Sequence, residues 1–262
     1  MQKVIFFDID GTLITEDERK IIPDSTRKAI ALARRNGHLT FVNTGRTLFH
    51  VSRDVRELGF DGMLCGCGTY IEYGGNELFY NRLSTELCRK IADSMRDCGA
   101  APVYERRDCL FFDRFYDNCP QIVDFRENFL TPDVSASHHT DDADFSFDKF
   151  VVFTDENTDI ASFRRIVGEN FDIIDRGGGF FENVPHGCSK ATAIDFILKK
   201  LGIPLENAYA IGDSMNDLPM FRAVPNSIAM GNGETVFPYV SYITAPILED
   251  GIEKALKHFG II

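Results

Sequence analysis

Acidic side chains stand at positions where they could act together on a charged group. Asp8 and Asp10 follow a short apolar segment and lie two residues apart, so both can leave the end of one strand on the same side. Asp213 follows a second apolar segment far along the chain. Two carboxylates this close repel each other unless a cation lies between them. Three carboxylates with space for water suit Mg²⁺, so the sequence predicts a magnesium site.

Groups that could hold an anion accompany these carboxylates. Thr44 can donate a hydrogen bond to a phosphate oxygen, and Gly45 lets the backbone approach it closely. Lys190 begins an expected helix, where its charge and the nearby N–H groups favour an anion. A carboxylate nucleophile, a metal, a lysine and hydroxyl or amide donors are the groups that phosphoryl transfer needs. The pattern therefore predicts phosphoryl transfer.

Short apolar runs that end in polar residues and glycine precede most of these positions. Such runs are typical of buried parallel strands. They are Lys3–Phe7, Leu39–Val42, Gly62–Cys65, Ala208–Ile211 and Ser227–Met230. Helical patterns alternate with them, which predicts an α/β fold with a doubly wound, mostly parallel, Rossmann-like sheet. Ligands bind such sheets at the carboxyl ends of the strands, so residues distant in sequence can converge there.

The pattern changes between residues 83 and 183. The expected strands are short and paired, which indicates an inserted α+β domain between two halves of a core, residues 1–82 and 184–262. Residues 131–148 are rich in Asp, Ser, His and Thr and are expected to form a loop. His138 and His139 lie there beside Asp141 and Asp142, but no ligand spacing is defined, so we expect a solvated loop rather than a metal site.

Composition limits the classes of partner. The chain has 262 residues and a formal net charge of −12, which would repel a nucleic acid duplex or an anionic membrane surface. No apolar run approaches the ~20 residues that cross a bilayer. We therefore expect neither nucleic acid nor membrane as a partner.

The chain has seven cysteines, an odd number, and no CxxC occurs, so we expect reduced thiols and a cytoplasmic protein.

Four segments together resemble the motifs of the haloacid dehalogenase superfamily. They are Asp8-Ile9-Asp10-Gly11-Thr12, Thr44-Gly45-Arg46, Lys190, and Gly212-Asp213-Ser214-Met215-Asn216-Asp217. Their order matches that of the family. The long insert before Lys190 lies where the Cof-type phosphatases carry a large α/β cap, so the resemblance implies that residues 83–183 form such a cap.

The resemblance also implies a role for each acidic residue. Asp8 would be the nucleophile that forms an aspartyl-phosphate. Asp10 would protonate the leaving oxygen, deprotonate the hydrolytic water, and reach the metal through its backbone carbonyl. Asp213 would be the third metal ligand beside Asp8 and Asp10. Asp217 would steady the metal, its waters and the Lys190 ammonium.

Further residues would bind the substrate. Thr44, Gly45, Lys190 and Asn216 would bind the phosphate, and Asn216 would also steady the metal or its waters. Arg46 follows Thr44-Gly45, and its guanidinium suits an anionic or polyhydroxyl ligand, so we expect it to contact the substrate.

The sequence departs from the family pattern at three places near these motifs. Asn43 precedes Thr44 where Ala or Ser is common. Ala191 follows Lys190 where Gly is frequent. The segment Leu64-Cys65-Gly66-Cys67-Gly68-Thr69-Tyr70-Ile71 occupies the place of the usual Asn-Gly-Ala loop, where Cys67 is expected to be a small buried filler.

The function expected from these features is that of a Mg²⁺-dependent phosphatase for small phosphorylated metabolites, with sugar phosphates first. It would act as a monomer or homodimer. A phosphatase for a cofactor phosphate such as FMN or pyridoxal phosphate, and a phosphomutase, are the alternatives within the same chemistry. A signalling receiver domain also combines acids, Thr and Lys at strand ends, but it needs only ~120 residues. An inert binding protein on the same fold is a further alternative.

Overall fold

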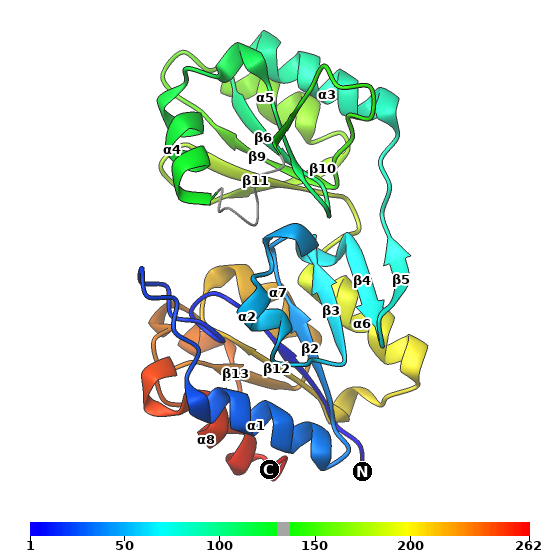
Figure 1. Ribbon diagram of the computed structural model, residues 1–262, viewed down its shortest axis with the longest axis vertical. Coiled ribbons are helices and arrows are strands. Elements are labelled where there is room, and N and C mark those ends of the chain that lie inside the picture. The colour runs from blue at the N-terminus through cyan, green and yellow to red at the C-terminus, as the bar shows by residue number, and fades with distance from the viewer. Residues whose placement is uncertain (130–136) are drawn as a thin grey trace. The chain divides into compact units, whose positions relative to one another are not determined.

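The computed structural model describes residues 1–129 and 137–262 of the chain (Figure 1). Their contacts define two compact units. The first consists of Met1–Gly45, Val51–Phe79 and Ser189–Ile262, and the second of Arg46–His50 and Tyr80–Cys188. The sequence placed the division after residue 82 and before residue 184, whereas the contacts place it after residues 79 and 188 and add a short piece of the first half to the second unit.

The first unit is built on an eight-stranded sheet in the order β14-β13-β12-β1-β2-β3-β4-β5. The strands are β1 (Val4–Phe7), β2 (Leu39–Asn43), β3 (Gly62–Cys65), β4 (Tyr70–Tyr73), β5 (Asn76–Tyr80), β12 (Ala208–Gly212), β13 (Asn226–Ala229) and β14 (Tyr242–Ile243). From β14 to β3 all neighbours are parallel. Strand β1 lies between β2 and β12, where the strand order changes direction. The predicted doubly wound, mostly parallel sheet is confirmed.

Helices pack against this sheet because its central strands, such as β1 and β12, are buried on both faces. They are α1 (Asp24–Arg35), α2 (Arg53–Arg56), α6 (Lys190–Leu201), α7 (Leu218–Ala223) and α8 (Gly251–His258). Phe6 of β1 packs with Ile194 of α6 and Phe221 of α7, whereas Ile5 and Phe7 point to the opposite face. Helices α1 and α8 lie side by side (Figure 1). Burial on both faces explains why β1 is an uninterrupted apolar run.

The second unit is built on a six-stranded sheet in the order β10-β11-β9-β6-β7-β8, in which only β7 and β8 are parallel neighbours among the described residues. Its strands are β6 (Ala101–Glu105), β7 (Leu110–Phe112), β8 (Ser137–His139), β9 (Lys149–Phe153), β10 (Phe171–Asp175) and β11 (Phe180–Pro185). Its helices are α3 (Thr85–Cys98), α4 (Pro120–Phe129) and α5 (Ile160–Val167).

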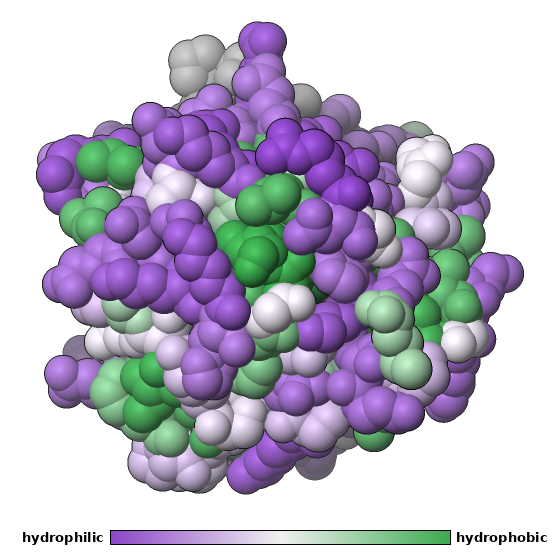
Figure 2. Space-filling model, turned by 90° about the horizontal axis from the view of Figure 1, so that it is seen from below, coloured by the Kyte–Doolittle hydropathy of each residue, from purple (hydrophilic) through white to green (hydrophobic). Residues whose placement is uncertain are grey.

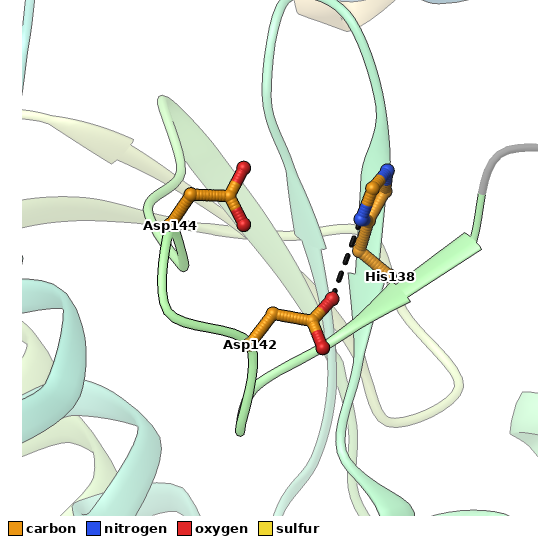
Figure 3. Close-up of side chains that lie close together, drawn as sticks. All are labelled: His138, Asp142 and Asp144. Carbon is orange, nitrogen blue, oxygen red and sulfur yellow. Dashed lines mark ion pairs between the residues drawn. The ribbon is translucent and has the colours of Figure 1, made fainter.

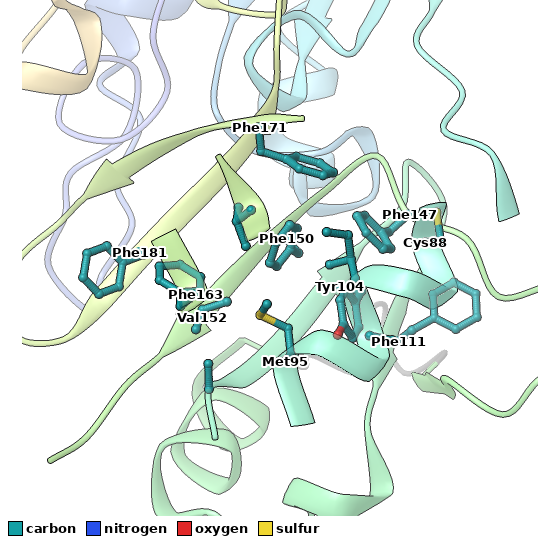
Figure 4. Close-up of a cluster of buried hydrophobic side chains, with 14 of the residues drawn as sticks. Cys88, Met95, Tyr104, Phe111, Phe147, Phe150, Val152, Phe163, Phe171 and Phe181 are labelled. Atoms are coloured by element: carbon teal, nitrogen blue, oxygen red, sulfur yellow. The ribbon is translucent and has the colours of Figure 1, made fainter. Parts of the chain in front are cut away.

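Aromatic side chains fill the core of this second unit. Figure 4 shows Tyr104 and Met95 surrounded by phenylalanine rings from several strands. The rings of Tyr104 and Phe147 have centroids 4.9 Å apart, and those of Phe150 and Phe171 are 5.2 Å apart. Many of the chain's phenylalanines thus serve as core side chains.

One part of the expected loop at residues 131–148 is a strand. Residues 137–139 form β8, which pairs with β7 in parallel, so the expectation of a loop was wrong for these residues. Their sequence, Ser-His-His, has no apolar pattern, and the strand depends on backbone pairing with β7 rather than on local preference. The part of the expected loop before them, residues 131–136, lies outside the described residues.

Asp148 is a buried carboxyl group of the second unit, and it makes the stability of the unit depend on pH. The Tyr80 hydroxyl donates a hydrogen bond of 2.7 Å to its Oδ1, and burial raises its pKa to about 6 from 3.8. The pKa of Asp148 is higher in the folded chain than in the unfolded chain. The stability that its neutral carboxyl group contributes below about pH 4 is therefore lost as pH rises through 6.

We therefore expect Asp148→Asn to become more stable than the unmodified chain as pH rises. The relative gain between about pH 4 and pH 7 should be about 2–3 kcal/mol in the free energy of unfolding. Urea denaturation of both chains, followed by circular dichroism, measures it. A difference that stays constant over this pH range would show that the carboxyl ionises equally in the folded and unfolded chains.

The surface in Figure 2 is mostly hydrophilic, with several separate apolar patches. Scattered apolar side chains of this kind are ordinary on globular proteins. Within the described ranges, none of the helices combines the length and the apolar character needed to cross a membrane.

Candidate active site

The carboxyl ends of β1, β2 and β12 bring the predicted residues of the first unit together. Asp8 follows β1, and its backbone N–H donates a 2.9 Å hydrogen bond to the carbonyl of Ile211 in β12. Asp213 follows β12, and Thr44 follows β2. Because these three strands are parallel neighbours around β1, the residues after them emerge at one edge of the sheet.

Lys190 forms the centre of a buried ionic group. Its Nζ lies 2.7 Å from Oδ1 of Asp8 and 2.6 Å from Oδ1 of Asp217, and its side chain is 2% exposed. Burial opposes its charge, but the carboxylates of Asp217 and Asp8 raise the pKa of Lys190 above its ordinary value. The lysine is therefore held as an ammonium ion between the carboxylates of Asp8 and Asp217.

Asp217 also shapes the loop that carries Asp213. Its Oδ2 accepts hydrogen bonds from the backbone N–H groups of Asp213 at 2.9 Å and Ser214 at 3.2 Å. Thr12 donates a hydrogen bond of 3.0 Å from its hydroxyl to Oδ1 of Asp213. Asp217 thus holds the backbone of Asp213, and Thr12 orients its carboxylate. Thr12 belongs to the first motif, and its contact with Asp213 was not predicted from the sequence.

Negative charge exceeds positive charge in this group. Single oxygens of Asp8, Asp213 and Asp217 lie within 4.8 Å of one another, and among the described residues Lys190 is the cation that pairs with them. Burial, reinforced by the charge of Asp217, raises the pKa of Asp8 to about 7. Burial and the charges of Asp8 and Asp217 raise that of Asp213 to about 8. The donor set is therefore one that a divalent cation would stabilise.

A glycine allows the first motif to lie against this carboxylate group. Gly11 has a φ of +73°, and a Cβ on it would lie 2.1 Å from Oδ2 of Asp213. Its carbonyl accepts a 2.9 Å hydrogen bond from the Asn232 side chain, whose Oδ1 in turn accepts one from the Ile247 backbone. Asn232, in the turn after β13, therefore holds the loop that follows Asp8 in place through its hydrogen bond to Gly11.

The remaining predicted residues differ in their surroundings. Asp10 is half-buried, and its charge is one of the causes that raise the pKa of Asp8. Thr44 is buried, and its backbone N–H donates a 2.9 Å hydrogen bond to the Leu64 carbonyl. Gly45 is half-buried beside it. All three belong to the first unit.

Two predicted residues have contacts other than those expected. Arg46 belongs to the second unit, where its Nη1 donates a 3.0 Å hydrogen bond to the His50 carbonyl. Asn216 accepts a short hydrogen bond from the Ser214 hydroxyl. The substrate contact of Arg46 and the phosphate contact of Asn216 stay predictions.

A second group of possible metal ligands lies in the second unit (Figure 3). Nδ1 of His138 is 3.3 Å from Oδ2 of Asp142, and the two side chains point toward each other. Asp144 is already paired with Arg106, whose Nη1 lies 3.3 Å from its Oδ2. Because this cation offsets the negative charge and Asp144 is exposed, we assign the group no metal.

Comparison with known proteins identifies the class. A family model described as haloacid dehalogenase-like hydrolase matches residues 5–256. The chain therefore belongs to this family of hydrolases, and the resemblance expected from the motifs is confirmed. It is a phosphatase of the family.

Individual relatives cover almost the whole chain. YkrA of Bacillus subtilis (strain 168) is 30% identical over 99% of this chain and 98% of its own length. The 5-amino-6-(5-phospho-D-ribitylamino)uracil phosphatase YcsE of the same strain is 26% identical over 98% and 95%. The solved structure of BT4131, a haloacid dehalogenase subclass IIB sugar phosphatase, is 29% identical, with a TM-score of 0.78 over 99% of this chain and 100% of that one.

Proposed function

We propose that this chain is a Mg²⁺-dependent phosphatase that hydrolyses small organic phosphates, sugar phosphates first, through an aspartyl-phosphate on Asp8. The observation that carries the proposal is the pairing of the buried Asp8 carboxylate with Lys190, beside Asp213 and Asp217. A carboxylate that is to attack a phosphorus atom must approach an anion, and this requires positive charge close to it.

Each residue would have a separate role in the reaction. An oxygen of Asp8 attacks the phosphorus, the bond to the leaving oxygen breaks, and Asp10 gives that oxygen a proton. Water then attacks the aspartyl-phosphate, loses a proton to Asp10, and releases phosphate and the free Asp8 carboxylate. Lys190 and Thr44 hold the phosphoryl oxygens, with Gly45 allowing close approach.

Asp8, Asp213 and the backbone carbonyl of Asp10 would hold the metal, with Asp217 nearby. When bound, Mg²⁺ supplies positive charge that offsets the phosphoryl oxygens and the clustered carboxylates. Burial, and after it the charge of neighbouring carboxylates, raises the pKa values of Asp8 and Asp213, and a bound cation would favour the ionised form of both, which supports this assignment.

The substrate class is supported by the relatives. The similarity to BT4131, a sugar phosphatase, supports a sugar phosphate as the substrate of this chain. The similarity to YcsE, which acts on a phosphorylated ribityl-amino-uracil, supports the alternative of a cofactor-related phosphate. A phosphomutase, the other alternative, would pass the phosphoryl group from the same aspartyl-phosphate to a second hydroxyl. We also propose that the second unit acts as a cap that selects small metabolites, and that the protein works as a monomer or homodimer.

Phosphate release from a panel of sugar, nucleotide and cofactor phosphates tests this function. We expect release with Mg²⁺ and a loss of at least about 100-fold with excess EDTA, restored by added Mg²⁺. Hexose or pentose phosphates should give the highest kcat/KM. Equal rates with and without EDTA would refute the metal requirement. Transfer to a second sugar hydroxyl without phosphate release would indicate a mutase.

A further inference from the structure

Asn43 is the last residue of β2, directly before Thr44, and it links this strand to α6, which begins at Lys190. Its side chain is fully buried, and its Nδ2 donates a 3.0 Å hydrogen bond to the backbone carbonyl of Lys190, the first residue of α6. Its Oδ1 is buried without a hydrogen-bond partner among the described residues. A buried, half-satisfied amide costs folding free energy that an apolar residue would avoid. Stability alone therefore does not explain why an amide side chain is present at this position.

The tight turn Gly66–Gly68 makes a second connection to Thr44. The backbone N–H of Cys67 donates a 3.0 Å hydrogen bond to the Thr44 carbonyl. Cys67 has φ 54° and ψ 39°, a left-handed conformation that residues other than glycine seldom adopt. Strain of this kind persists only where the surroundings impose it.

The same turn lies directly against the start of α6. Gly68 has a φ of +86°, and a Cβ on it would lie 2.7 Å from the carbonyl oxygen of Ser189 and 3.3 Å from Cβ of Ala193. Ser189 is the N-cap of α6, and its hydroxyl accepts a hydrogen bond from the Thr192 backbone. The turn thus touches the residue that fixes where the helix, and with it Lys190, begins.

We propose that Asn43 and the turn Gly66–Gly68 form a brace that sets the position of Thr44 relative to Lys190. Asn43 links β2 to the first turn of α6 by its side-chain hydrogen bond. The Gly66–Gly68 turn contacts Thr44 through the Cys67 backbone and packs against Ser189 through Gly68. The brace residues are positioning residues, because they act through Thr44 and Lys190. The inference rests on the proposed phosphate-binding roles of those two residues.

Gly68→Ala tests the brace, with Gly75→Ala as its matched control. Gly75 also has a positive φ, +77°, but a Cβ on it would meet nothing within 4 Å. Both variants therefore carry backbone strain, and only Gly68→Ala pushes on Ser189. We expect kcat for phosphate release to fall by about tenfold or more in Gly68→Ala, with a smaller change in KM, because misplacement by ~1 Å costs up to about 10²-fold. Gly75→Ala should stay within about twofold of the unmodified chain.

Amide hydrogen exchange gives a readout that does not depend on turnover. We expect the amides of residues 190–193 to exchange faster in Gly68→Ala than in Gly75→Ala. Equal exchange and equal kcat in the two variants would overturn the brace. If the unmodified chain hydrolyses no phosphate, the proposed function fails, and the exchange data still decide whether the turn holds the helix.

Asn43→Ala covers the case in which Gly68→Ala does not fold. It removes the hydrogen bond to the Lys190 carbonyl without adding bulk. We expect kcat to fall by roughly threefold to tenfold, with faster exchange at residues 190–193. An unchanged kcat with unchanged exchange would remove Asn43 from the brace.

Discussion

Replacement of Asp8 by asparagine is expected to lower phosphate release by at least about 10³-fold, because an amide cannot take the phosphoryl group as a carboxylate does. The fold should persist. Lys190 keeps its 2.6 Å pairing with Asp217 after the substitution, so the ammonium is not left buried without a partner. The rate is measured with the best substrate of the panel at saturating Mg²⁺, and the fold by circular dichroism and thermal melting.

A carboxylate outside the site provides the control for this variant. Asp142→Asn makes the same chemical change in the second unit, at the group beside His138, and should keep a normal rate. Turnover by Asp8→Asn at a normal rate and with normal Mg²⁺ dependence would refute the nucleophile assignment.

The second large effect is expected at Lys190. Lys190→Ala should lower kcat by about 10²-fold or more, as expected for the loss of one electrostatic stabiliser of the transferred group. It should also lower the free energy of unfolding by about 3 kcal/mol near neutral pH, because Asp8 and Asp217 would be buried without their cation. Steady-state kinetics and urea denaturation measure the two effects.

Lys199→Ala is the matched control, since Lys199 lies exposed on the same helix. It should change neither quantity appreciably. A change in kcat below threefold for Lys190→Ala would move the phosphate-binding role to another residue, whatever the effect on stability.

The sequence could predict the sheet and the acidic group because both depend on local patterns. Apolar runs such as Val4–Phe7 are buried on both faces, and parallel strands have their carboxyl ends at one edge. Asp8 and Asp213 follow two neighbouring strands, so their convergence followed from topology alone. Lys190 reached them because α6 begins at that same edge.

Other features depend on contacts that no local pattern encodes. The link from Asn43 to the Lys190 carbonyl joins residues far apart in the chain, and a single asparagine gives no signal of it. Strand β8 is polar and exists through pairing with β7. Arg46 follows Thr44 closely, yet the chain enters the second unit at this residue. Adjacency in sequence therefore did not determine the surroundings of its guanidinium.

A covalent trap shows whether the phosphoryl group passes through Asp8. The protein is mixed with substrate and Mg²⁺, quenched in acid during turnover, digested, and analysed by mass spectrometry. We expect the peptide that contains Asp8 to carry one added phosphoryl group, and the Asp8→Asn protein to carry none. Rapid turnover with the phosphoryl group on another residue, or with no phosphorylated protein at any quench time, would show that Asp8 is not the nucleophile.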